Sequence, residues 1–162
     1  MPQYPVPTTN SIVVGTASGI LYMEFEHGSG TAILPGDVVQ FNNPPADCTV
    51  KAGVADSEEI IGVADISAAS ATSPPRGSDR VTAYATGDQV LLFRGSVICM
   101  LRIATSEEIQ CGEFVQSAGD GEVKAYVCGT DNDCQRIAQA LETTAQDTTA
   151  FQWGMFALER FG

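Results

Sequence analysis

The sequence predicts an all-β protein, a small barrel or sandwich of short strands with at most one or two short helices. The first observation is a phrase that recurs, in which glycine is followed by an acidic residue and then by an apolar stretch. Its copies are Pro35-Gly36-Asp37-Val38-Val39, Thr86-Gly87-Asp88-Gln89-Val90 and Cys111-Gly112-Glu113-Phe114-Val115. Glycine permits a tight turn, and the acidic side chain can bond the amides of that turn. Each copy therefore marks the start of a strand.

The other two observations are the β-branched and aromatic content of the segments and their spacing, with turn signals about every eight to twelve residues. The predicted strands are residues 12–14, 20–25, 38–41, 60–66, 80–85, 89–93, 96–104, 114–117, 122–127, 136–142 and 151–161. We expect a hairpin between the first two. Residues 67–79 contain an Ala/Ser run and two prolines, and form either a surface loop or one short helix.

The charge balance argues against two classes of partner. The chain has 162 residues and a net charge of −12, from 20 acidic and 8 basic residues. Nucleic acid and anionic lipid both require Lys and Arg to neutralise phosphate, so we expect neither as a partner. An acidic surface keeps many copies soluble at high local concentration, and a salt-rich source would leave the same trace.

The two ends of the chain differ from the middle. Residues 1–11 hold three of the eight prolines without a periodic apolar pattern, which predicts an extended arm outside a single domain of residues 12–162. The opening lacks the features of a secretory signal, and the apolar runs are too short to span a membrane. We therefore expect synthesis in a cytoplasm. The last strand, with Phe151, Trp153 and Phe156, either closes its own barrel or forms a subunit interface.

No catalytic group emerges from the remaining chemistry, and we expect no enzymatic activity, metal or cofactor. His27, the single histidine, lies in a glycine-rich stretch without a partner nucleophile and is predicted to be a solvated loop residue. Five cysteines are an odd number, and reduced thiols are the default in a cytoplasm. The segment between Cys128 and Cys134 is a polar hairpin turn or is closed by a disulfide. Lys124 is an exposed strand lysine or the modified lysine of a lipoyl-type carrier domain.

A series of short segments resembles the capsid decoration, or cement, proteins of tailed bacterial and archaeal viruses. The resemblance covers about residues 34–142 and rests on the order and spacing of the whole series. Its members are Leu34-Pro35-Gly36-Asp37-Val38-Val39, Ala52-Gly53-Val54-Ala55, Ile61-Gly62-Val63-Ala64-Asp65, Gly87-Asp88-Gln89-Val90, Gly95-Ser96-Val97, Ile109-Gln110-Cys111-Gly112-Glu113-Phe114-Val115 and Arg136-Ile137-Ala138-Gln139-Ala140-Leu141-Glu142.

This resemblance implies a small β-barrel or tulip-like sandwich that forms a trimer at three-fold and quasi-three-fold positions outside an icosahedral capsid. The implied partner is the major capsid protein, and the implied role is to stabilise the head against internal DNA pressure. The arm would lie on the capsid, and the expected capsid-binding residues are Tyr4 and Val6 in the arm together with Ile12 and Val13 at the start of the domain. Two alternatives stay open: another virion β-module, such as a head fibre base or a tail component, and a lipoyl-type carrier modified on Lys124.

Overall fold

The computed structural model describes residues 13–16, 20–42, 48–65, 83–147 and 152–158. The predicted arm and residues 67–79 lie outside these ranges. The elements are β1 (Val13–Thr16), β2 (Leu21–Glu26), β3 (Val38–Phe41), β4 (Val50–Ala52), β5 (Ile60–Ala64), β6 (Gln89–Arg94), β7 (Val97–Ile103), β8 (Phe114–Gly119), β9 (Glu122–Ala125), the 3-10 helix η2 (Asp133–Gln135), β10 (Ala138–Ala140) and β11 (Gln152–Leu158). The all-β prediction is confirmed.

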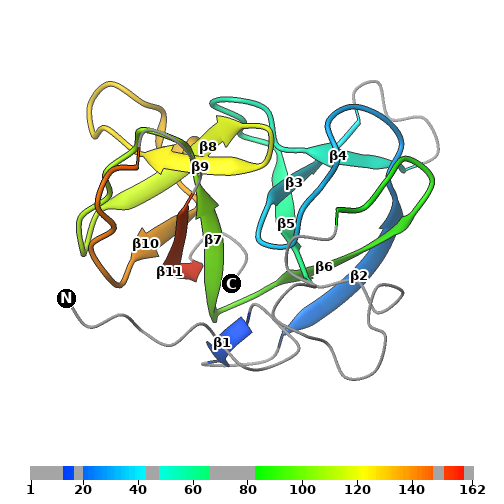
Figure 1. Ribbon diagram of the computed structural model, residues 1–162, viewed down its shortest axis with the longest axis horizontal. Helices are drawn as coiled ribbons and strands as arrows, with labels where there is room; N and C mark the ends of the chain where they lie inside the picture. The colour runs from blue at the N-terminus through cyan, green and yellow to red at the C-terminus, as the bar shows by residue number, and fades with distance from the viewer. Residues whose placement is uncertain (1–12, 17–19, 43–47, 66–82, 148–151, 159–162) are drawn as a thin grey trace.

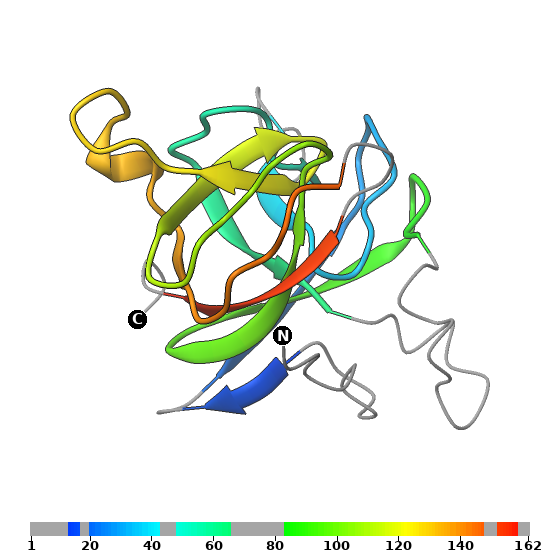
Figure 2. The same cartoon turned by 60° about the vertical axis from the view of Figure 1, so that its left-hand side comes forward.

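The strands form a closed barrel and a second sheet (Figure 1). In the first sheet the order is β1-β7-β11-β10-β8-β9, and a further pairing between β7 and β9 closes β7, β11, β10, β8 and β9 into a ring, seen from another side in Figure 2. β1 extends this sheet along β7. The second sheet has the order β2-β6-β5-β3-β4. Every strand pair is antiparallel except β7 with β9. The barrel alternative of the sequence analysis is thus present together with a second layer.

The strands and their pairing differ from the sequence prediction in three places. The predicted hairpin of β1 and β2 is wrong, because β1 pairs with β7 in the barrel sheet while β2 pairs with β6 in the second sheet. The predicted strand of residues 80–85 is represented in the described part by Tyr84, which forms an isolated bridge with Ile33. β4, a strand of three residues, was not predicted. Local apolar patterns show that a segment is extended, but they do not name its neighbour.

Two apolar clusters make up the core, one on each face of the second sheet. The larger cluster fills the barrel and continues onto the near face of this sheet, where it includes Val38 and Phe93. The smaller one covers the opposite face and includes Val39 and Leu92. Adjacent residues of a strand point to opposite faces, so β3 and β6 each supply both clusters. The second sheet is therefore buried on both sides along these central strands.

The three copies of the glycine–acid phrase fold into the same turn. The φ angles of Gly36, Gly87 and Gly112 are +86°, +91° and +92°, the region that favours glycine. In each copy the amide of the acidic residue donates to the carbonyl three residues earlier at 3.0 Å, as in a type II turn. The acidic side chain accepts from the amide of that same earlier residue at 2.7 Å. The predicted bond between acid and turn is confirmed in every copy.

Each turn is also held against one residue of a neighbouring segment. The glycine amide donates to the carbonyl of that residue, and the residue's own amide donates to the carbonyl of the acid, over 2.7 to 2.9 Å. The residues in this position are Ala64 for the first turn, His27 for the second and Ala140 for the third. Three turns far apart in the sequence therefore use one backbone arrangement to start β3, β6 and β8.

Candidate functional site

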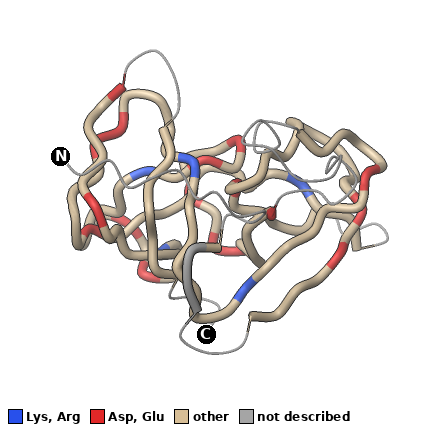
Figure 3. The backbone as a smooth tube through the Cα atoms, turned by 60° about the horizontal axis from the view of Figure 1, so that its bottom comes forward, with Lys and Arg blue, Asp and Glu red and all other residues tan. Residues whose placement is uncertain are grey.

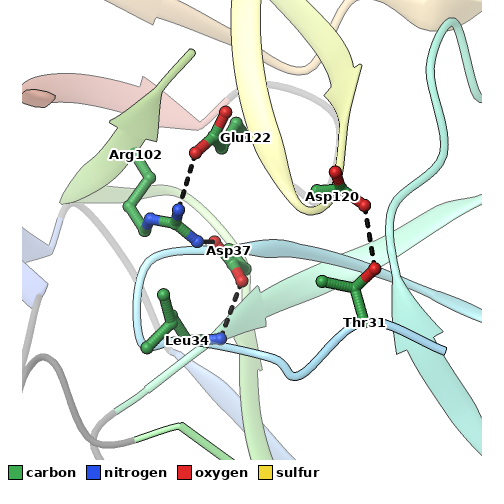
Figure 4. A network of polar contacts seen from close by, with 6 residues as sticks. All are labelled: Thr31, Leu34, Asp37, Arg102, Asp120 and Glu122. Carbon is green, nitrogen blue, oxygen red and sulfur yellow. Dashed lines mark hydrogen bonds and ion pairs between the residues drawn. The ribbon is translucent and has the colours of Figure 1, made fainter. Parts of the chain in front are cut away.

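A buried ion-pair network joins the barrel to the second sheet (Figure 4). Arg102 on β7 directs one guanidinium nitrogen to Asp37 Oδ1 and the other to Glu122 Oε1, both at 2.6 Å. The second oxygen of Asp37 accepts the Leu34 amide at 2.7 Å. The side chain of Asp37 is fully buried, that of Arg102 is 8% exposed and that of Glu122 is 20% exposed. Two carboxylates thus share one cation in a largely buried site.

Burial governs the protonation of both carboxylates. Desolvation raises the pKa of Asp37 to about 7, although the charge of Arg102 and the hydrogen bonds from Leu34 and Arg102 act in the opposite direction. The pKa of Glu122 is also raised, chiefly by desolvation, while Arg102 lowers it. With both carboxyl groups ionised the network would carry one excess negative charge, so proton uptake relieves an unfavourable buried charge.

The tip of the β8–β9 hairpin lies against this network. Gly121 accepts the amide of Val38 at 2.8 Å and donates to the carbonyl of Gly53 at 3.1 Å, so the barrel hairpin bonds directly to the second sheet. A Cβ on Gly121 would lie 2.5 Å from Asp37, which shows that only glycine fits here. Asp120, also at the tip, accepts from the Thr31 hydroxyl at 2.9 Å (Figure 4). We call this contact between the hairpin tip, Asp37 and Arg102 the joint.

A second polar contact between the two layers runs through the loop that connects β4 and β5. Lys124 on β9 pairs with Asp56 at 2.7 Å, and the Asp56 amide donates to Ser117 at 2.9 Å. The Gln135 amide group reaches the Asp56 carbonyl at 2.8 Å, and Asn132 donates to Glu58 at 2.7 Å. Lys124 therefore lies within a strand and in an ion pair, while Asp120 and Gly121 occupy the hairpin tip.

The Cys128 to Cys134 segment forms a polar turn. Asp131 Oδ2 accepts from the Val127 amide at 2.7 Å and from the Gln116 side chain at 2.8 Å, and Asn132 caps η2 through a reciprocal pair of bonds with Gln135. Cys128 and Cys134 are exposed and free in this structure, and a disulfide between them stays a prediction. No group of three or more metal-ligating side chains occurs within the part of the chain that the structure describes.

Tyr126 fixes one side of this turn. Its hydroxyl donates to Asp133 Oδ1 at 2.5 Å, and this hydrogen bond is the main cause that raises the pKa of Tyr126 to about 12.

Across the outer barrel surface, the guanidinium of Arg136 lies 4.1 Å from the ring centre of Phe114. Most of the described cationic side chains thus have a partner. Arg102 and Lys124 form ion pairs with carboxylates, and Arg136 lies over an aromatic ring. Figure 3 shows the acidic positions of the described residues spread along the backbone of both halves of the fold.

Only part of the predicted binding surface falls within the described residues. Tyr4, Val6 and Ile12 lie outside them, while Val13 begins β1, pairs with Cys99 and packs against the larger core cluster. The assignment of these four residues to capsid binding stays a prediction. The position of Val13 shows that β1 is part of the barrel sheet. A capsid-binding arm would therefore have to end before β1.

The last strand closes the chain's own barrel. β11 pairs with β7 on one side and with β10 on the other, and Phe156 lies inside the barrel with 1% of its surface exposed. Trp153 is half-buried against the larger core cluster, and its ring lies where a Cβ on Gly36 would come within 2.3 Å. Phe151 lies outside the described residues. A subunit interface on β11 stays a prediction, and it would have to use other side chains than Phe156.

His27 is not the solvated loop residue that the sequence predicts. It is 1% exposed, and neither ring nitrogen has a hydrogen-bond partner among the described residues. The cause is the backbone pairing with Gly87 and Asp88, which extends the β2–β6 pairing by one residue and places His27 where the other turns have an alanine. Glycine neighbours in the sequence suggested exposure, and the distant turn overrides that signal.

The joint was not identified from the sequence, although one signal for it exists. Arg102 is the charged residue in an otherwise apolar strand, Val-Ile-Cys-Met-Leu-Arg-Ile. A cation in such a strand requires an anionic partner when it is buried. The sequence does not say which of the 20 acidic residues supplies that partner.

The described surface also carries four exposed large apolar side chains: Leu21, Tyr22, Val54 and Val127. Two of them are adjacent in β2, at the edge of the second sheet, with exposed fractions of 53% and 46%. Within the described residues, no helix is long and apolar enough to cross a membrane. Of the four, Leu21 and Tyr22 lie in a strand, whereas Val54 and Val127 lie in connecting segments.

The comparisons with known proteins concern the fold. No protein-family model and no curated protein matches the chain. Among solved structures, the chain is similar to "head fiber gp8.5 N base in bacteriophage phi29", with a TM-score of 0.53 and 11% sequence identity. The similarity covers 87% of this chain and 97% of that chain. At this identity the likeness shows that the two chains share a fold.

Proposed function

We propose that the chain is a structural protein of a virion that binds the outside of an icosahedral head. The observation that carries this proposal is the similarity to a phage head fibre base over nearly all of that chain. The resemblance of residues 34–142 to capsid decoration proteins points independently to the same class.

More specifically, we propose that the chain is a decoration protein that forms a trimer at the three-fold and quasi-three-fold positions of the icosahedral head. A trimer that contacts several capsid subunits must be released before those subunits separate, so the head resists internal DNA pressure. Three arms on one trimer raise the effective concentration of each binding segment and strengthen attachment without any new contact. No bond is made or broken in this role. The major capsid protein is the proposed partner.

The second candidate is a head fibre base. The similarity to the solved structure of a phage head fibre base favours it. The two candidates differ in where the protein lies and in how many copies a virion carries. A decoration protein covers the whole head surface, whereas a fibre base occupies the attachment positions of fibres and carries further protein outward.

The test uses virions of the virus that encodes this chain. We expect mass spectrometry of purified particles to detect the protein and immunogold labelling to place it on the head exterior. Labelling spread over the head supports decoration, and labelling at discrete fibre positions supports the fibre base. Absence from purified virions contradicts both candidates. An intact mass without an increment on Lys124 is expected, and a covalent prosthetic group there would instead support the carrier alternative.

The arm and the trimer have their own experiment. We expect light scattering to give the mass of a trimer for both the full chain and a variant that lacks residues 1–11. Only the full chain should sediment with heads purified from a deletion strain. Equal sedimentation of the truncated protein would contradict the capsid-binding assignment of Tyr4 and Val6, and a monomer mass would contradict the trimer.

A further inference from the structure

Within the described residues, β2 is an edge strand of the second sheet. It lies at the end of the second sheet (Figure 1), and within the described residues it pairs with β6 alone. Its six residues match six of β6, from Leu21 opposite Arg94 to Glu26 opposite Gln89. The outer edge of a strand of this length presents a row of backbone donors and acceptors, which is a template for a further strand.

The register identifies the backbone groups that face outward. The His27 amide donates to the Asp88 carbonyl at 2.9 Å, in continuation of the β2–β6 register. In an antiparallel pair, hydrogen-bonded residues alternate, so Phe25 and every second residue before it bond to β6. Glu24 and Glu26 therefore turn their amides and carbonyls to the open edge.

The side chains of β2 divide the edge into two chemically different faces. Leu21, Met23 and Phe25 lie on one face, where Phe25 packs against Phe41 with ring centres 5.1 Å apart and belongs to the margin of the smaller core cluster. Tyr22, Glu24 and Glu26 lie on the other face and are exposed, and the Tyr22 ring lies edge-on to Phe93 with ring centres 6.4 Å apart. An additional strand would thus find apolar surface on one side and, beyond the Tyr22 ring, two carboxylates on the other.

We propose that the outer edge of β2 binds an extended segment of a partner protein whose side chains alternate between apolar and basic. The apolar side chains would extend the surface of Leu21, Met23 and Phe25, and the Lys or Arg side chains would lie opposite Glu24 and Glu26. A second copy of β2 is a poor occupant, because it would bring glutamates near glutamates in a chain of net charge −12. This inference rests on the proposed function, in which the partner segment belongs to the head surface.

The test compares binding of full-length variants to heads purified from the deletion strain. Glu24→Pro removes one outward amide, and an edge strand tolerates proline at such a position. Glu24→Lys keeps the backbone and reverses the charge, so it guards against a folding defect in the proline variant. Glu108→Lys, an equal charge change at another exposed glutamate, is the matched control. We expect both Glu24 variants to weaken binding about tenfold or more, and the control to differ less than about twofold.

Hydrogen exchange supplies the second readout. In the free protein the Glu24 and Glu26 amides should exchange rapidly, and in the head-bound protein both should become protected. If the wild type does not bind heads, the proposed function fails. If the wild type binds but β2 gains no protection, or if Glu24→Lys binds as the control does, the docking site is wrong while the function stands. Protection that appears in the free protein with rising concentration would assign the edge to a second copy and overturn the proposal.

Discussion

At the residue scale, the surroundings of Asp37 separate it from its two counterparts. Asp37, Asp88 and Glu113 occupy the same place in the same turn and make the same bond to a backbone amide. Asp88 and Glu113 are exposed, whereas Asp37 is buried between Arg102 and the Gly121 tip. One local motif therefore serves as a simple turn at two sites and as part of the joint at the third.

Burial of Asp37 predicts that stability depends on pH. Burial raises its pKa from the ordinary 3.8 to about 7 in the folded chain, so between these values the folded state binds a proton that the unfolded state lacks. The free energy of unfolding should then fall as pH rises from about 4 to about 7, by at most about 1.4 kcal/mol per pH unit. Glu122, whose pKa is also raised, contributes with the same sign. Urea denaturation across this range measures the slope.

Asp37→Asn isolates the contribution of Asp37, because the amide stays uncharged throughout. We expect the stability of the wild type relative to Asp37→Asn to decrease as pH rises through the same window. Asp88→Asn repeats the substitution in an exposed copy of the turn and controls for changes in the turn bond itself. Parallel pH curves for the wild type and Asp37→Asn would refute the assignment.

Removal of Arg102 should be more damaging than neutralisation of Asp37. Arg102→Met leaves Asp37 and Glu122 without their shared cation in a site that is at most 20% exposed. Loss of one partner from a buried ion pair costs about 3–5 kcal/mol. The double variant Arg102→Met, Asp37→Asn should recover part of that loss, since it removes one of the uncompensated charges. Additive costs in chemical denaturation would show that the two residues do not interact energetically.

At the scale of the elements, the turns begin the strands and the long-range pairings choose their partners. Ala64, His27 and Ala140 bind the three turns through the same two backbone hydrogen bonds, although they lie 28 to 60 residues from the glycine of their turn. The turns could be predicted because their residues are contiguous. The residues that bind the turns could not be predicted, because they do so through backbone amide and carbonyl groups, which every residue type except proline offers.

The three turn glycines form a matched series for substitution by alanine. Each has a positive φ angle near +90°, so alanine should cost roughly 1–3 kcal/mol from backbone strain alone at Gly87 and Gly112, where a Cβ meets no atom within 4 Å. At Gly36 a Cβ would meet the Trp153 ring at 2.3 Å, so the cost should be larger. Chemical denaturation ranks the variants, and a change in tryptophan emission for Gly36→Ala alone would report the displaced ring. Equal costs at all three sites would contradict the Trp153 contact.

At the scale of the whole molecule, a shared apolar cluster and the joint connect the barrel to the second sheet. The larger cluster contains side chains from both layers, and the Gly121 tip bonds to Val38 and Gly53 across them. Contacts of this kind predict that the layers unfold as one cooperative unit, as expected if residues 12–162 form the predicted single domain. A rigid body is also what a protein needs if it is to transmit load between subunits of a shell.

Hydrogen exchange tests this cooperativity. We expect the slowest amides of β5 in the second sheet and of β11 in the barrel to open with the same free energy. Gly121→Ala forces a Cβ to within 2.5 Å of Asp37 at a φ of +78° and should weaken the joint without touching either strand. In that variant the amides of β5 should lose protection before those of β11. Different opening energies in the wild type would mean that the two layers are separate folding units.

The sequence by itself determined the strand class, the three turns and most strand positions, because these depend on residues that are neighbours along the chain. Only the tertiary structure decided that β1 and β2 belong to different sheets, that β11 closes the barrel, that His27 is buried and that Asp37 faces Arg102 and Glu122. Each of these depends on which distant segments meet. Alternation of apolar residues specifies a face but not a partner, and a buried charge reveals that it needs a counter-ion without revealing which one.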